Sequence, residues 1–125
     1  MNNEPTFGHG KICYIEVPSS NIARSAAFYS TVFNWTIRTR DDGSISFDDG
    51  IGGVSGVFLL GRKAVTSADM LISIMVDDAA ATLELITANG GKVTEPIGRH
   101  LPEITARFTD PTGNLWGIYQ HRGVI

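Results

Sequence analysis

Hydrophobic and β-branched residues alternate with turn-forming residues along the chain and predict two consecutive sets of elements. A strand at 12–17 stops at Pro18, and apolar residues at three- and four-residue spacing then predict a helix over 22–33. Aspartate-glycine turns separate the short strands that follow. These strands are expected at 35–38, 44–47 and 54–60.

The same order of elements restarts after a linker at 62–69. The segment 71–76 predicts a strand, and Asp77 or Asp78 can cap a helix that ends at the Asn-Gly-Gly of 89–91. The remaining strands are expected at 92–95, 105–109 and 115–120.

Both halves therefore share the order βαβββ, and the letters repeat as well, since IEVPSSNIARS parallels IMVDDAAATLE and SFDDG parallels RFTDPTG. We predict an α+β fold in which residues 1–125 form a single domain, with module one at 11–61 and module two at 70–121. The two tandem modules are expected to form a curved mixed sheet around a central cleft, with the helices on the outer face. This inter-module cleft is the expected ligand site.

Composition and charge exclude several classes of protein. The chain has 125 residues and a net charge of −3, and its ten basic residues form no run, so no nucleic-acid partner is expected. No window approaches the length of a membrane span, and the polar N-terminus MNNEPTFGHG has no feature of a signal peptide. The single cysteine, Cys13, favours a reducing cytoplasm and is expected to be a buried, unreactive thiol.

Three segments resemble the vicinal oxygen chelate superfamily, which contains glyoxalases, bleomycin-resistance proteins and extradiol dioxygenases. They are YIEVPSSNIARSAAFYSTVFNW at 14–35, ITANGGKV at 86–93 and ARFTDPTGNLWGIYQ at 106–120. The resemblance implies the doubled βαβββ fold, and it implies a homodimer. It does not specify an activity, because this fold carries lyases, isomerases, dioxygenases and drug-binding proteins.

The superfamily's chemistry usually depends on a divalent metal that chelates two neighbouring oxygens of the substrate and acts as a Lewis acid. Its ligands are typically a histidine on the first strand of each module and a carboxylate on the last strand. Aligned on the valine that ends each first strand and on the D-P-x-G-N turn, these positions fall on Ile12, Leu71 and Gly117. The fourth lies within 51–61, which has no Asp, Glu, His or Cys. No cofactor is therefore expected, although a divalent metal held by other ligands stays possible.

Strand alternation places a different set of side chains beside Ile12 and Leu71. The predicted ligand-binding residues are Tyr14, Glu16, Ser73, Met75, Arg107 and Tyr119. Glu16 is the candidate catalytic residue, as a general base, and its alternative role is a salt bridge with Arg107 that organises the pocket. Arg107 can bind an oxyanion, and the two tyrosines can stack on a ring or only line the wall. His100 is expected at the surface, within reach of the cleft mouth.

These residues predict a protein that binds a small organic molecule without the superfamily's metal. One alternative is a metal-independent lyase or isomerase that uses Glu16 as its base. A second is a conventional metal-dependent lyase or dioxygenase with unrecognised ligands, and a third is an interaction subunit without a ligand.

Overall fold

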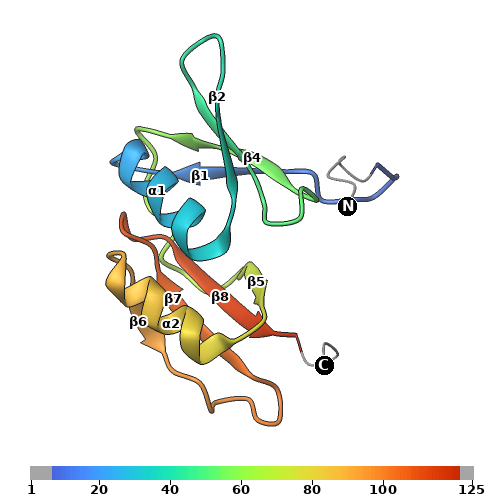
Figure 1. Ribbon diagram of the computed structural model, residues 1–125, viewed down its shortest axis with the longest axis vertical. Helices are drawn as coiled ribbons and strands as arrows, with labels where there is room; N and C mark the ends of the chain where they lie inside the picture. The colour runs from blue at the N-terminus through green and yellow to red at the C-terminus, as the bar shows by residue number, and fades with distance from the viewer. Residues whose placement is uncertain (1–6, 122–125) are drawn as a thin grey trace. The chain divides into compact units, whose positions relative to one another are not determined.

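Two units with the same topology make up the chain, as a computed structural model that describes residues 7–121 shows (Figure 1). The units divide between Lys63 and Ala64, and each has its own four-stranded sheet. The first contains β1 (Tyr14–Pro18), α1 (Ile22–Phe33), β2 (Thr36–Thr39), β3 (Ile45–Asp48) and β4 (Ser55–Leu59). The second contains β5 (Ser73–Val76), α2 (Ala79–Ala88), β6 (Lys92–Glu95), β7 (Thr105–Thr109) and β8 (Leu115–Gln120). The predicted α+β class and doubled βαβββ order are confirmed.

The first and last strands of each module are neighbours in its sheet. The strand orders are β1-β4-β3-β2 and β5-β8-β7-β6. In both sheets the first pair is parallel and the other pairs are antiparallel. A parallel pair needs a long crossover, which the helix and the intervening hairpin supply. The sequence repeat is therefore a repeat of topology.

An aromatic cluster holds α1 against the first sheet. The side chain of Asn21 caps the helix by accepting a hydrogen bond from the backbone of Arg24 at 3.1 Å. Tyr29 is fully buried, and its ring stacks on Trp35 with centroids 4.5 Å apart. Phe47 and Phe58 continue the cluster from β3 and β4, with centroids 5.0 Å apart. The helix-facing side of this sheet is thus filled by rings.

The second sheet buries a more aliphatic layer under α2. Asp78 caps this helix by accepting a hydrogen bond from the backbone of Ala81 at 3.1 Å. The largest fully buried side chains are Ile86 from the helix, Phe108 from β7 and Ile118 from β8. Trp116 is also buried, as the alternation of the last strand predicts.

The D-P-x-G-N turn between β7 and β8 is closed by buried side chains. One carboxylate oxygen of Asp110 accepts from the backbone of Thr112 at 3.1 Å and from that of Asn114 at 2.9 Å. The other accepts from the Asn114 side-chain amide at 2.9 Å. The Asn114 amide oxygen in turn accepts from the backbone of Val65 at 2.9 Å, so the turn anchors the segment that enters module two.

The first strand of each module is shorter than the hydrophobic pattern predicts. Before β1, only the Cys13 carbonyl continues the ladder, by accepting from Ser55 at 3.1 Å. Before β5, Ile72 does the same for Gly117 at 2.9 Å. The prediction that Cys13 is buried is wrong, because its side chain is exposed. Cys13 lies before the first residue of β1, so the alternation expected for a strand over 12–17 does not apply to it.

Candidate functional site

Two of the predicted ligand-binding residues lie on the face of the first sheet that α1 leaves uncovered. Tyr14 is 42% exposed, and the Glu16 side chain is 49% exposed. The Glu16 carboxylate accepts a hydrogen bond from the guanidinium of Arg62 at 2.6 Å. This ion pair lies within the first unit of the chain. The pattern of strands could not indicate this, since Arg62 follows β4 and belongs to no strand.

The other four predicted residues share one face of the second sheet. Ser73 is in register with Gly117, and Gly117 with Arg107, so these three positions form a row across the strands. Met75 and Tyr119 are in register in the next row. Met75 is 62% exposed, and the Tyr119 hydroxyl donates to Glu103 at 3.0 Å. Module two therefore presents an apolar thioether, a phenol, a hydroxyl and a guanidinium together.

A β-bulge adds a carboxylate to this face that sequence reasoning missed. Between Val93 and Glu95 the register with β7 shifts, so that Glu95 rather than Thr94 lies opposite Arg107. The extra residue turns Glu95 to the side of the sheet on which Arg107 lies. The Glu95 carboxylate is 3.7 Å from the Arg107 Nε. The residues KVTE of β6 contain no residue type that is typical of a bulge. The charge of Glu95 is therefore the only feature of the sequence that could have suggested this residue.

A second polar group lies on β3 and its neighbours. One carboxylate oxygen of Asp48 accepts from the Arg38 guanidinium at 2.9 Å and from the Ser55 hydroxyl at 2.6 Å. This network ties β2, β3 and β4 together on one face. Its donors and acceptors satisfy one another, which favours a structural role.

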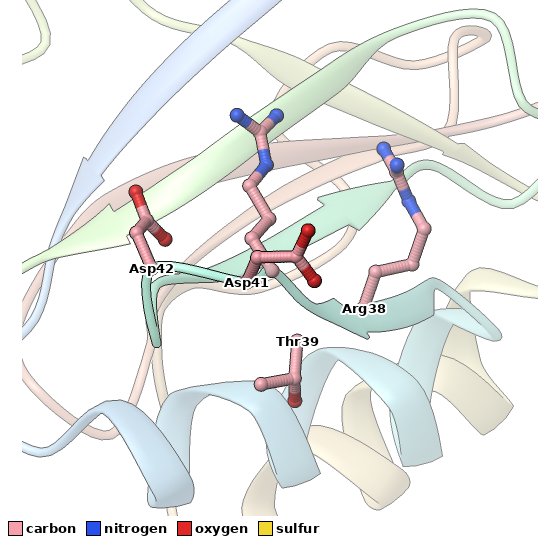
Figure 2. A pocket seen from close by; sticks show the side chains of 5 residues that line it. Arg38, Thr39, Asp41 and Asp42 are labelled. Carbon is pink, nitrogen blue, oxygen red and sulfur yellow. The ribbon is translucent and has the colours of Figure 1, made fainter.

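The tip of the β2–β3 hairpin carries a shallow hollow, which Figure 2 shows at close range. It is lined by the consecutive residues Arg38, Thr39, Arg40, Asp41 and Asp42. Arg38 and Thr39 point to opposite sides of the strand, so few side chains converge there (Figure 2). Hydrogen bonds from the Ser44 side chain and backbone hold the pKa of the Asp42 carboxyl below its ordinary value of 3.8. These hydrogen bonds stabilise the turn of the hairpin, and they do not indicate a binding site.

Comparison with known proteins decides the family. The sequence profile of the Glyoxalase/Bleomycin resistance protein/Dioxygenase superfamily matches residues 11–118. The chain belongs to this superfamily. A glyoxylase-like domain-containing protein of Didymella fabae is 31% identical over 132 residues, which cover 92% of this chain and 97% of that protein.

Solved structures of the glyoxalase superfamily have the same fold. A superfamily member from Sphaerobacter thermophilus gives a TM-score of 0.73 at 15% identity, covering 90% of this chain and 98% of its own. The fosfomycin resistance protein FosX from Mesorhizobium loti gives 0.71 at 15% identity, with 94% and 96% covered. Within residues 7–121 of this glyoxalase superfamily chain, no helix is long and apolar enough to cross a bilayer.

The positions that hold the metal in the glyoxalase superfamily carry side chains that do not fit one. Ile12 is 74% exposed and Leu71 is partly buried, and neither has a donor atom. A Cβ built on Gly117 would lie 2.6 Å from the Ser73 Oγ and 3.2 Å from a Leu71 methyl carbon, so neighbouring side chains fill that space. In the part of the chain that the structure describes, no three His, Cys, Asp or Glu side chains form a metal-binding group.

The strand registers locate the fourth position, which the sequence leaves open within 51–61. Tyr14 and Ser73 each lie three residues before the valine on which the two first strands align, and their register partners are Ser55 and Gly117. Ser55 is therefore the counterpart of Gly117, and its hydroxyl already donates to Asp48 at 2.6 Å. The superfamily's usual donor set is absent from all four positions.

Proposed function

We propose that this protein binds a small organic ligand without the metal of its superfamily. The observation that carries the proposal is Gly117, where a carboxylate would be needed. Ser73 and Leu71 occupy the space that a side chain on Gly117 would enter. Binding by shape, stacking and hydrogen bonds is then the function that the remaining side chains support.

The chemistry of the helix-free sheet faces supports such a ligand. Small-molecule sites combine apolar and aromatic side chains with a few polar groups that fix orientation. Module two offers Met75 and Tyr119 beside Arg107, and module one offers Tyr14 beside Glu16. Tyrosine rings pack on planar ligands while their hydroxyl groups form hydrogen bonds, so an aromatic or otherwise planar compound is the expected class.

Elemental analysis of protein purified without an affinity tag tests the metal part of the proposal. We expect far less than one equivalent of any transition metal, and no rise of the melting temperature on adding zinc, nickel, manganese or iron. A library of planar organic compounds, in contrast, is expected to contain members that raise the melting temperature, because a ligand that binds only the folded state stabilises it by mass action. One equivalent of bound metal would overturn the proposal and favour a metal-dependent lyase or dioxygenase.

The same library tests the alternative of a metal-independent lyase or isomerase. That alternative requires a stabilising compound to be converted, and Glu16→Gln to abolish the conversion while leaving the melting temperature intact. The 2.6 Å hydrogen bond from Arg62 holds one oxygen of this carboxylate, which supports a binding role for Glu16 instead. Failure of every compound to stabilise the protein would leave an interaction subunit as the better account.

We also propose that the protein is a homodimer of the reducing cytoplasm. Apolar side chains on and before the edge strands support a partner chain, since Ile12, Met70 and Met75 are 74%, 83% and 62% exposed. The single cysteine supports the compartment, because no disulfide can form within the chain. Light scattering is expected to give the mass of two chains, and the mass of one chain at micromolar concentration would contradict the proposal.

A further inference from the structure

Two arginines and a histidine surround the Glu95 carboxylate at the edge of module two. Glu95 ends β6, and its side chain is 18% exposed. One carboxylate oxygen is 4.0 Å from the Arg99 Nε, and the other is 3.7 Å from both the His100 Nε2 and the Arg107 Nε. Two arginines are always charged, so the group has an excess of positive charge whether or not His100 is protonated.

The guanidinium groups of Arg99 and Arg107 form no hydrogen bond with Glu95. The contact of each with Glu95 is made by Nε, at a distance too long for a hydrogen bond. Within residues 7–121, the side chains of Arg99, His100 and Arg107 donate no hydrogen bond. The other ion pairs of the chain differ, since Arg38 and Arg62 bind their carboxylates through terminal nitrogens at 2.9 and 2.6 Å. The paired terminal nitrogens of Arg99 and Arg107 are therefore available to a further acceptor.

The β-bulge explains why this arrangement exists. In a regular ladder the neighbour of Arg107 would be Thr94, and Glu95 would leave the opposite face. The bulge instead places a carboxylate beside Arg107, in the row that continues through Gly117 to Ser73. Bulges are frequent next to binding sites, where they re-aim a side chain.

We propose that Arg107, Arg99 and His100 form a binding site for an oxyanion, a carboxylate or a phosphate-type group, that belongs to the ligand of this sheet face. The Glu95 carboxylate competes with the oxyanion for these cations and limits their affinity through its own charge. An oxyanion would accept hydrogen bonds from the terminal nitrogens of the arginines, which suit its geometry. This proposal rests on the proposed function, which places the ligand on this face of the sheet. It adds that the ligand is an organic anion.

Titration of ¹⁵N-labelled protein with phenylphosphonate at low ionic strength tests the assignment. We expect saturable shifts of the Arg99 and Arg107 Nε–H signals, together with the amide signals of residues 94–100. Arg107→Gln is expected to weaken binding about tenfold or more, because it removes charge-assisted hydrogen bonds. Glu95→Gln is expected to tighten binding about fivefold, the effect of removing one unit charge at ~4 Å in water.

Arg38→Gln is the matched control, since it makes the same change of net charge in the first module. It should leave the affinity for phenylphosphonate within about twofold, as expected for an exposed charge screened by solvent. Equal weakening by Arg38→Gln and Arg107→Gln, or no tightening by Glu95→Gln, would overturn the site. Should Arg107→Gln fail to fold, Glu95→Gln still decides the question through the sign of its effect.

Benzyl alcohol, a neutral probe with the same ring, separates this assignment from the proposed function. Shifts around Met75 and Tyr119 with benzyl alcohol, but none at Arg107 with phenylphosphonate, would support a ligand site and refute the oxyanion site. Inorganic phosphate bound at Arg107, in a protein that no planar organic compound stabilises, would support the oxyanion site and refute the proposed function.

Discussion

Replacing Gly56 with alanine is expected to lower the free energy of unfolding by about 3 kcal/mol or more. Gly56 lies in β4 and is in register with Ile15 of β1 and Phe47 of β3. An added Cβ would overlap with the Ile15 carbonyl oxygen and with the Phe47 ring, including a ring carbon at 2.8 Å. The ring cannot move away cheaply, because it is stacked on Trp35 with centroids 4.7 Å apart. Urea denaturation followed by tryptophan fluorescence measures the loss.

Gly117→Ala is the control, since Gly117 is also a glycine in the last strand of its module, one residue before the position that corresponds to Gly56. The atoms that its Cβ would meet are the Ser73 hydroxyl and a Leu71 methyl group, both of which are ends of side chains. Rotation of Ser73 can relieve the contact, so the cost is expected to stay below about 1 kcal/mol. A Gly56→Ala protein as stable as the Gly117→Ala protein would show that Phe47 does not pack on the β4 backbone.

Asp110→Ala is expected to destabilise the fold by about 2–4 kcal/mol. The Asp110 carboxylate is 3% exposed and accepts hydrogen bonds from two backbone groups and from the Asn114 amide. Its removal leaves buried donors without acceptors and loosens Asn114, which holds Val65. The measurement is again the urea midpoint, with circular dichroism to show that the variant is folded at zero denaturant.

Asp42→Ala separates the effect of burial from that of the turn itself. Asp42 forms the same kind of local hydrogen bonds, to the Ser44 backbone at 2.9 Å and to its hydroxyl at 2.6 Å, but on an exposed hairpin. Water can replace the carboxylate there, so the loss is expected to be much smaller than that of Asp110→Ala. Equal losses for the two variants would mean that the Asp110 turn is solvated.

The fold was predictable because its signals are local. The helical stripe that includes Tyr29 and the alternation around Trp116 each depend on a few neighbouring residues, and both side chains are buried in the structure. The repeat of letters then supplied the topology that local signals lack. The order of the elements and their repeated topology thus follow from the sequence alone.

The candidate site was only partly predictable, because its contacts connect distant residues. Alternation placed Arg107 and Tyr119 on one face, but the bulge that brings Glu95 beside Arg107 has no signature in composition. The partner of Glu16 comes from Arg62, 46 residues away in the chain. Contacts of this kind depend on the conformation of the residues at the ends of strands and loops. Residue propensities do not specify that conformation.

The pairing of the first strand with the last in each module determines the order in which the chain can assemble during synthesis. The β2–β3 hairpin can form early, but β1 has no sheet partner until β4, which ends at Leu59, has left the ribosome. All strands of the first sheet then exist before any strand of the second. The situation recurs when β5 waits for β8. A nascent chain therefore passes twice through a stage in which an apolar strand is unpaired, and these are the two stages at which a chaperone would have most to protect.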